Sequence, residues 1–210
     1  MGKSKTEALR IIHNSAVAFQ NNLANKNVMF VTVVDGKAEL FEASFLPRNF
    51  LHLTGIRTEL SSTAFFSLAL RDRLRAQDIA FATDGTTDKK LSVLKPLMNI
   101  HKTAKMLGDY DHSQRLLVTD KLTGTVTFAM GFRRDGKFYM PNTSLKTDVR
   151  TISKKPIQRI AAIFVKEMKE AKYCNLTYIA KGYTIDDDVF ASVMCDRVDK
   201  GILTIMPATP

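Results

Sequence analysis

The sequence predicts an α+β fold in which N-terminal helices pack on an antiparallel β-sheet arranged as a meander, with a C-terminal helix after the sheet. Three observations predict it. Apolar residues recur at helical spacing near the N-terminus, a β-branched segment meets an Asp-Gly pair at 35–36, and strand patterns separated by short turns follow between residues 115 and 140. Helices followed by strands that are adjacent in sequence are typical of this class.

The first 45 residues predict a helix and a β-hairpin. Ser4 and Glu7 have the spacing of a capping box, which satisfies free amides at a helix start. The apolar positions that follow are at helical spacing: Leu9, Ile12, Ala16, Phe19 and Leu23. Residues 28–34 are rich in β-branched side chains and lead into the Asp-Gly pair, a strong hairpin signal, so 37–45 is the predicted return strand.

The segment from Phe45 to Ile56 predicts an ordered corner between a strand and a helix. Pro47 fixes one backbone angle, and Gly55 permits a conformation that residues with a Cβ avoid. Arg48 and His52 are presented from this corner, so much of the functional hypothesis depends on it.

The remaining elements follow from periodicity and turn signals. A helix is predicted at 61–74, and another after the loop at 83–87, with its apolar face on Leu91, Leu94, Met98 and Leu107. Strands are predicted at 115–120, 125–132 and 137–140, with turns at 121–124 and 134–136. A helix is predicted from Pro156 to Lys172, followed by a strand at 176–179, an acidic helix at 186–198 and a strand at 202–205.

Composition excludes several classes of protein. No run approaches the ~20 apolar residues that a membrane helix needs, and the N-terminus lacks the apolar core of a signal peptide. Cys174 and Cys195 lack metal-type spacing and are expected to be free thiols. We expect a cytoplasmic protein with one α+β domain over 1–183 and an acidic extension over 184–210 that packs on it.

The net charge of +10 favours a nucleic-acid partner, although many basic proteins have no such role. Between Arg133 and Arg159 eight basic residues stand against two acidic ones, so the charge is segregated. We expect a basic face, with a solvated lysine face as the alternative for the segment around Lys102. The predicted nucleic-acid-binding residues are Arg48, Arg133, Arg134, Arg150, Lys154, Lys155 and Lys102.

The chemically active residues suit RNA cleavage without a metal or a cofactor. The sequence has no Gly-rich phosphate loop, no His-Glu-x-x-His and no Cys-x-x-Cys. His52 is the best candidate for base or acid, because imidazole changes protonation nearest to neutral pH. Candidates for holding the phosphate are Arg48, Lys146 and Arg133 or Arg134, and Ser144 or Thr143 could donate a hydrogen bond to it. Tyr139 offers a hydroxyl donor or a stacking face. A corner histidine that only bonds the backbone is the competing interpretation of His52.

Two short motifs carry a resemblance to a known family. Residues 49–55, Asn-Phe-Leu-His-Leu-Thr-Gly, and the segment at 131–145 with the basic stretch after it resemble the phage-encoded barnase/EndoU/colicin/RelE-like (BECR) nucleases, over roughly residues 25–182. The resemblance implies an RNase-like architecture and an endoribonuclease encoded by phages or other mobile elements. It matches His52 to the motif histidine, and Ser144 with Lys146 to the Pro-x-x-Ser region.

Two functional hypotheses follow. The first is a metal-independent endoribonuclease that uses the ribose 2′-OH as nucleophile and leaves a 2′,3′-cyclic phosphate. The second is a non-catalytic inhibitor from a mobile element that binds RNA, or a host ribonucleoprotein such as a CRISPR effector. Both would act in the cytoplasm of the host cell, and both use the same basic residues.

Overall fold

The computed structural model describes residues 2–113 and 117–205. Its helices are α1 (Lys5–Asn22), α2 (Phe50–Thr54), α3 (Ser62–Leu70), α4 (Thr86–Leu97), α5 (Ile100–Thr103) and α6 (Ala191–Asp196), with short 3-10 turns η1 (Pro47–Asn49), η2 (Ala76–Asp78), η3 (Val149–Thr151) and η4 (Asp188–Phe190). Its strands are β1 (Lys26–Val34), β2 (Lys37–Phe45), β3 (Met106–Asp109), β4 (Lys121–Gly124), β5 (Ala129–Asp135), β6 (Phe138–Leu145), β7 (Gln158–Glu167), β8 (Asn175–Ile179) and β9 (Thr204–Ile205).

Seven of the strands close into a mixed β-barrel. Their order is β1-β2-β6-β5-β4-β3-β7, and β7 pairs back onto β1 from Lys26↔Glu167 to Thr32↔Ile160. Within the barrel only the pairing of β2 with β6 is parallel, and it places one residue pair in register, Ala43↔Tyr139. β8 and β9 extend the sheet beyond β7. The prediction of helices on an antiparallel meander is therefore wrong, because the sheet is mixed and closes on itself.

The predicted N-terminal helix and hairpin are confirmed as α1, β1 and β2. The Ser4 hydroxyl accepts a 3.1 Å hydrogen bond from the Glu7 amide at the start of α1. Asp35 and Gly36 both have positive φ, as a two-residue type I′ turn requires, and β1 pairs with β2 along its whole length.

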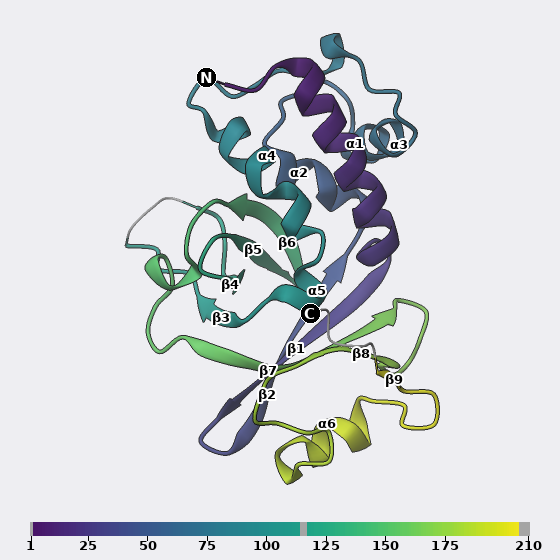
Figure 1. Cartoon of the computed structure of the whole chain (residues 1–210), viewed down its shortest axis with the longest axis vertical. Helices are drawn as coiled ribbons and strands as arrows, with labels where there is room; N and C mark the ends of the chain where they lie inside the picture. The colour runs from purple at the N-terminus through teal and green to yellow at the C-terminus, as the bar shows by residue number, and fades with distance from the viewer. Residues whose placement is uncertain (1, 114–116, 206–210) are drawn as a thin grey trace.

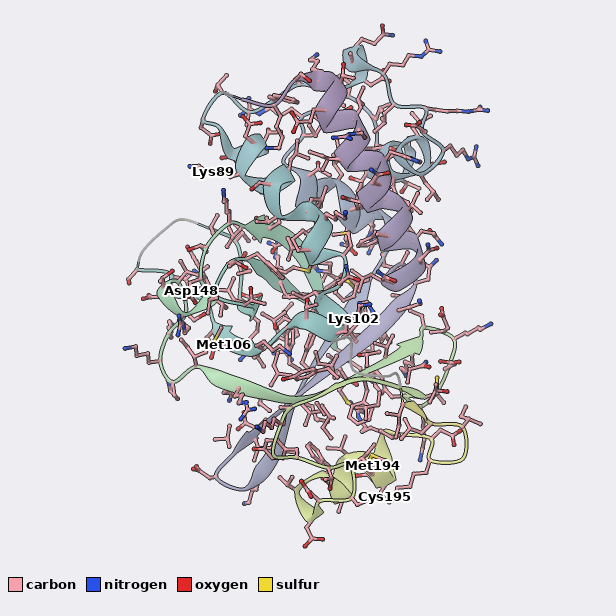
Figure 2. All side chains as sticks on the ribbon, viewed as in Figure 1. Lys89, Lys102, Met106, Asp148, Met194 and Cys195 are labelled. Carbon is pink, nitrogen blue, oxygen red and sulfur yellow. The ribbon has the colours of Figure 1, made fainter. Side chains whose placement is uncertain are left out.

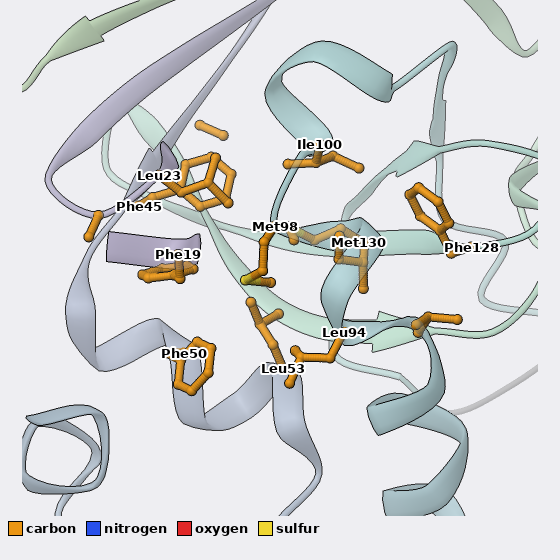
Figure 3. Packing of buried hydrophobic residues seen from close by; sticks show 14 of the residues in the cluster. Phe19, Leu23, Phe45, Phe50, Leu53, Leu94, Met98, Ile100, Phe128 and Met130 are labelled. Atoms are coloured by element: carbon orange, nitrogen blue, oxygen red, sulfur yellow. The ribbon is translucent and has the colours of Figure 1, made fainter. Parts of the chain in front are cut away.

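The helices α1, α2, α3 and α4 gather at one end of the barrel, and α6 lies beyond β1 and β7 at the other end (Figure 1). The main core joins these four helices to the barrel interior. Figure 3 shows Phe19 of α1 beside Phe50 of α2, whose ring centroids are 5.4 Å apart, with Leu53 and Leu94 facing Met130 of β5. Each of these large side chains contributes roughly 2–3 kcal/mol by leaving water. None of the described helices is long and apolar enough to span a bilayer.

The predicted helix from Pro156 to Lys172 is wrong, because residues 158–167 form β7. Ile160, Ile163 and Val165 belong to the main core, whereas Ala161, Ala162 and Phe164 belong to a second cluster on the outer side. A strand covered on both faces has no polar side, so its apolar positions also fit a helical spacing.

Further assignments between α4 and β5 are wrong. Residues 121–124, predicted as a turn, form β4, and Leu107, predicted on a helix, lies in β3. Gly124 is a close-approach glycine, since a Cβ there would lie 2.2 Å from the Phe128 carbonyl oxygen. Of the predicted strand at 115–120, residues 115 and 116 lie outside the described residues, and 117–120 are not in a strand.

The predicted acidic helix and last strand appear in shortened form as η4 with α6, and as β9. Phe190, Val193 and Met194 pack with Met29 and Val31 of β1 in the second cluster. Arg197 forms a 2.7 Å ion pair with Glu42 of β2. The division into a domain at 1–183 and an extension at 184–210 stays a prediction, and residues 206–210 lie outside the described part.

Candidate functional site

The corner that presents His52 is fixed at both ends. The Asn49 side chain accepts a 2.9 Å hydrogen bond from the Leu46 amide, which begins η1. Gly55 ends α2 in the left-handed region at φ 70°, and a Cβ there would lie 2.8 Å from Cδ of Lys90. The Thr87 hydroxyl donates a 2.7 Å hydrogen bond to the Gly55 carbonyl, so α4 holds the end of α2.

Ser144 ties the same helix to the barrel. Its side chain is 1% exposed, and its hydroxyl donates a 2.6 Å hydrogen bond to the carbonyl oxygen of Leu53. His52, which directly precedes Leu53 in the chain, is exposed, and its imidazole makes no hydrogen bond to any described residue. Ser144 therefore acts on the backbone beside His52, while the imidazole faces solvent.

A cavity of about 540 Å³ lies beside His52. It brings together four of the predicted residues, which are Arg48 and His52 from the corner and Arg133 and Arg134 from the end of β5. The remaining lining residues are Asn49, Val118, Asp135, Met140, Pro141 and Asn142. The strand order produces this meeting, because β6 lies between β2, which leads into the corner, and β5.

The cavity is positively charged. Three arginines stand against Asp135, a formal +2 with His52 neutral. Arg48, Arg133 and Arg134 form no ion pair within the described part of the chain, and the Asp120 carboxylate accepts its 2.8 Å hydrogen bond from the Arg134 amide, not from its guanidinium. The Arg134 guanidinium donates a 3.4 Å hydrogen bond to the Gly136 carbonyl through Nε, which leaves its terminal nitrogens available. Guanidinium groups that form no ion pair at a cavity wall can bind an anion such as phosphate through two parallel hydrogen bonds.

Sequence reasoning missed Asn142. It lies on β6 inside the 131–145 segment that carries the family resemblance. Its side-chain amide group donates to the Val118 carbonyl, and its side-chain oxygen accepts from the Thr119 hydroxyl at 3.2 Å. It lines this cavity and a second one on the other side of His52. The motif itself was the available signal, because the Pro-x-x-Ser spacing places Asn142 directly after Pro141.

Lys90 is a second missed residue. Its ammonium group donates a 2.9 Å hydrogen bond to the main-chain oxygen of His52. Partial burial against α2 lowers the pKa of Lys90 from 10.5 to about 8. In the sequence, Lys90 is one of five lysines in the acid-free segment 89–105, and nothing there links it to His52.

Tyr139 and Lys146 do not line the cavity, although Tyr139 directly precedes Met140, which does. The Tyr139 ring packs against Phe41 with centroids 4.8 Å apart, at the single β2–β6 pair. Lys146 is exposed just beyond the end of β6.

The remaining predicted binding residues lie elsewhere. Lys102 of α5 and the 148–150 segment lie well apart in Figure 2, and Lys102 lines a separate cavity of about 530 Å³ with Val126 and Phe128. Arg150 forms a 2.6 Å ion pair with Asp148, which raises the pKa of Arg150 and lowers that of Asp148. Lys154 and Lys155 follow η3 beside β3, three strands from β6. The described residues hold no group of three or more His, Cys, Asp or Glu able to bind a metal ion.

Comparison with known families decides the membership. The model of the phage-Barnase-EndoU-ColicinE5/D-RelE like nuclease 4 family (PBECR4) matches residues 11–182. The chain belongs to this family. The predicted family resemblance is thus confirmed, and PBECR4 membership indicates a nuclease that acts on nucleic acid. The PBECR4 match includes every residue that lines the cavity beside His52, and it ends before η4, α6 and β9. No curated protein and no solved structure matches the chain.

Proposed function

We propose that this PBECR4 protein is a metal-independent endoribonuclease with His52 as its general base. One observation carries the proposal: an exposed imidazole that makes no hydrogen bond to the described residues shares a cavity with three arginines that form no ion pair there. A base beside a phosphate-binding surface is what 2′-OH transesterification requires, because the nucleophile comes from the RNA itself.

The reaction proceeds by transfer within the RNA backbone. His52 accepts the proton of the ribose 2′-OH, the 2′ oxygen bonds to phosphorus, and the bond from phosphorus to the 5′ oxygen breaks. The departing 5′ oxygen takes a proton from water in the open cavity. Arg48, Arg133 and Arg134 offset the charge that develops on the phosphate oxygens. The products are a 2′,3′-cyclic phosphate and a 5′-OH end.

We assign supporting roles to the other predicted site residues. Ser144 is a positioning residue, because its hydroxyl holds the Leu53 carbonyl and with it the turn that carries His52. Tyr139 supports the β2–β6 contact through Phe41. Lys146, exposed past β6, adds positive charge that attracts RNA, and we extend this role to Arg150, Lys154, Lys155 and Lys102. The family description supports an origin in a phage or another mobile element, and hence action in the cytoplasm of a host cell.

The test is cleavage of end-labelled single-stranded RNA in EDTA. Wild type should produce 2′,3′-cyclic phosphate ends, and His52→Ala should cleave 10²–10⁴-fold more slowly, the usual contribution of one positioned base. His112→Ala is the matched control, since His112 is also exposed but lies against Tyr110, away from the cavity. Cleavage that needs a divalent metal, or that persists unchanged in His52→Ala, would contradict the mechanism.

The same experiment separates the second candidate function. A non-catalytic inhibitor that binds RNA or a host ribonucleoprotein would use the same arginines. The observation that favours this candidate is that His52 is the one imidazole among the described residues lining the cavity, so no second histidine lies there to act as a general acid. It predicts RNA binding that weakens with salt and no cleavage products in any variant.

A further inference from the structure

A second cavity, of about 500 Å³, lies on the other side of His52. It is lined by Leu51, His52, Gly55, Ile56, Arg57, Thr58, Glu59, Lys90 and Asn142. His52 and Asn142 line both cavities, so the two hollows are neighbours separated by these side chains. Each has a volume in the range usual for small-ligand sites.

The second cavity is also positive. Arg57 and Lys90 stand against Glu59, a formal +1 with His52 neutral. Arg57 is exposed and forms no ion pair within the described ranges. The hydrogen bonds of Asp84 with Thr86 account for most of the lowering of the Asp84 pKa, and the positive charge of Arg57 adds a smaller contribution. The charged path from the first cavity therefore continues past His52.

The position of Lys90 favours an anionic ligand here. Its stem packs over Gly55, and its ammonium group is partly withdrawn from water without a carboxylate partner among the described residues. Removing a charged group from water is costly unless an opposite charge compensates it. A phosphate in this cavity would supply that charge.

The rest of the lining suits a nucleoside. Leu51 and Ile56 offer apolar surface, and Thr58 and Glu59 offer acceptors for the amino groups of a base. A cavity that combines apolar surface with cations and polar acceptors suits a nucleotide better than an isolated phosphate.

We propose that this second cavity binds one of the two nucleotides joined by the scissile phosphate, with Arg57 and Lys90 contacting its phosphate. A single-stranded RNA then runs through both cavities and crosses between them at His52 and Asn142. The inference rests on the proposed endoribonuclease function and deepens it, because it places the cleaved bond at the junction of two subsites.

The test measures binding apart from cleavage. Fluorescein-labelled 2′-O-methyl RNA of eight nucleotides binds without being cut, because the 2′ nucleophile is blocked. Arg57→Ala and Lys90→Met should each weaken binding about tenfold and reduce the slope of log affinity against log salt by about 0.7, the contribution of one phosphate contact on a single strand. Lys90→Met keeps the stem over Gly55, and thermal unfolding checks that both variants fold.

Matched controls remove a charge outside the cavities. Lys89 is exposed and projects outward from α4 in Figure 2, and Arg10 is exposed on α1. Lys89→Met and Arg10→Ala should bind as wild type does. If Arg57→Ala and Lys90→Met match these controls, the second subsite is overturned.

Cleavage assays with unmodified RNA keep the two proposals distinguishable. A wild type that binds but never cuts would overturn the proposed reaction, while weakened binding in Arg57→Ala would still support the second subsite. A wild type that cuts normally alongside unaffected Arg57→Ala and Lys90→Met would overturn the subsite alone. A wild type that neither binds nor cuts RNA would overturn both.

Discussion

The hydroxyl of Ser144 and the carbonyl oxygen of Leu53 lie 2.6 Å apart, although 91 residues separate them in the chain. This hydrogen bond joins β6, which lines the cavity through Asn142, to the short helix that carries His52. A five-residue helix has little stability of its own, so tertiary bonds of this kind hold it in place.

Replacing Ser144 should therefore affect both stability and cleavage. Ser144→Ala leaves the buried Leu53 carbonyl without its partner, and we expect the free energy of unfolding to fall by about 1–3 kcal/mol. Cleavage should fall less than in His52→Ala, since the base remains. Ser92→Ala is the control, because that exposed hydroxyl bonds only within α4. Chemical denaturation checks the stability, and an unchanged midpoint would contradict the assigned role.

Gly55 and Gly36 provide a matched pair for testing the corner. Their φ angles are 70° and 73°, but a Cβ at Gly36 meets nothing within 4 Å, whereas one at Gly55 meets Lys90 and the Thr87 backbone. Gly36→Ala should cost about 1 kcal/mol from backbone strain alone. Gly55→Ala should cost more, and it should also reduce RNA cleavage. Equal losses of stability would show that the contact with α4 does not constrain the corner.

His101 makes the fold sensitive to acid. It is 7% exposed, and burial, with Lys102 and Lys26 nearby, lowers its pKa from 6.5 to about 4. The unfolded chain thus binds a proton between pH 6.5 and 4 that the folded chain refuses, so the free energy of unfolding falls as the pH falls through this window. The full loss approaches about 3 kcal/mol. His101→Leu should flatten this part of the stability–pH curve, and an unaltered curve would contradict the assignment.

The arginines of the first cavity should differ from Arg150. Arg133→Ala should weaken binding of single-stranded RNA and reduce the salt slope by about 0.7, because its guanidinium is unpaired and faces the cavity. Arg150→Ala should have a smaller effect, since Asp148 already neutralises that group. Fluorescence anisotropy at several salt concentrations measures both, with Arg10→Ala as a reference. A larger effect at Arg150 would place the RNA on the other side of the barrel.

Local signals predicted the parts of the fold that local forces decide. The Asp35-Gly36 turn specified the first hairpin, and Pro47 with Gly55 specified the corner, because each restricts backbone angles directly. Closure of the barrel could not be predicted in this way. The pairing of β1 with β7, from Lys26↔Glu167 to Thr32↔Ile160, joins residues far apart in the chain, and no turn sets its register.

The sequence likewise predicted some residues of the candidate site and not others. His52 and Arg48 lie in a motif, and Arg133 and Arg134 stand out as charge in a basic segment. Lys90 stands in the acid-free lysine segment 89–105 and Arg57 has no basic neighbour, so nothing in the sequence linked either to His52. Only the packing of α4 and the chain after α2 against the corner brings them beside His52. Ser144 was noticed for its hydroxyl, but the buried environment that commits that hydroxyl to Leu53 is a property of the folded barrel.

The parallel pairing of β2 with β6 is the weakest connection in the barrel, because it has one residue pair in register. β1 has seven or more such pairs with each of β2 and β7. Arg48 follows β2 and Asn142 lies on β6, so the cavity beside His52 is lined from both sides of this strand pairing. An RNA strand bound across this pairing would contact residues attached to both strands, where the protein itself supplies few contacts between them. Bound substrate would then stabilise the β2–β6 pairing. As a result, the amide hydrogens of residues flanking Ala43 and Tyr139 would exchange with solvent more slowly in the complex.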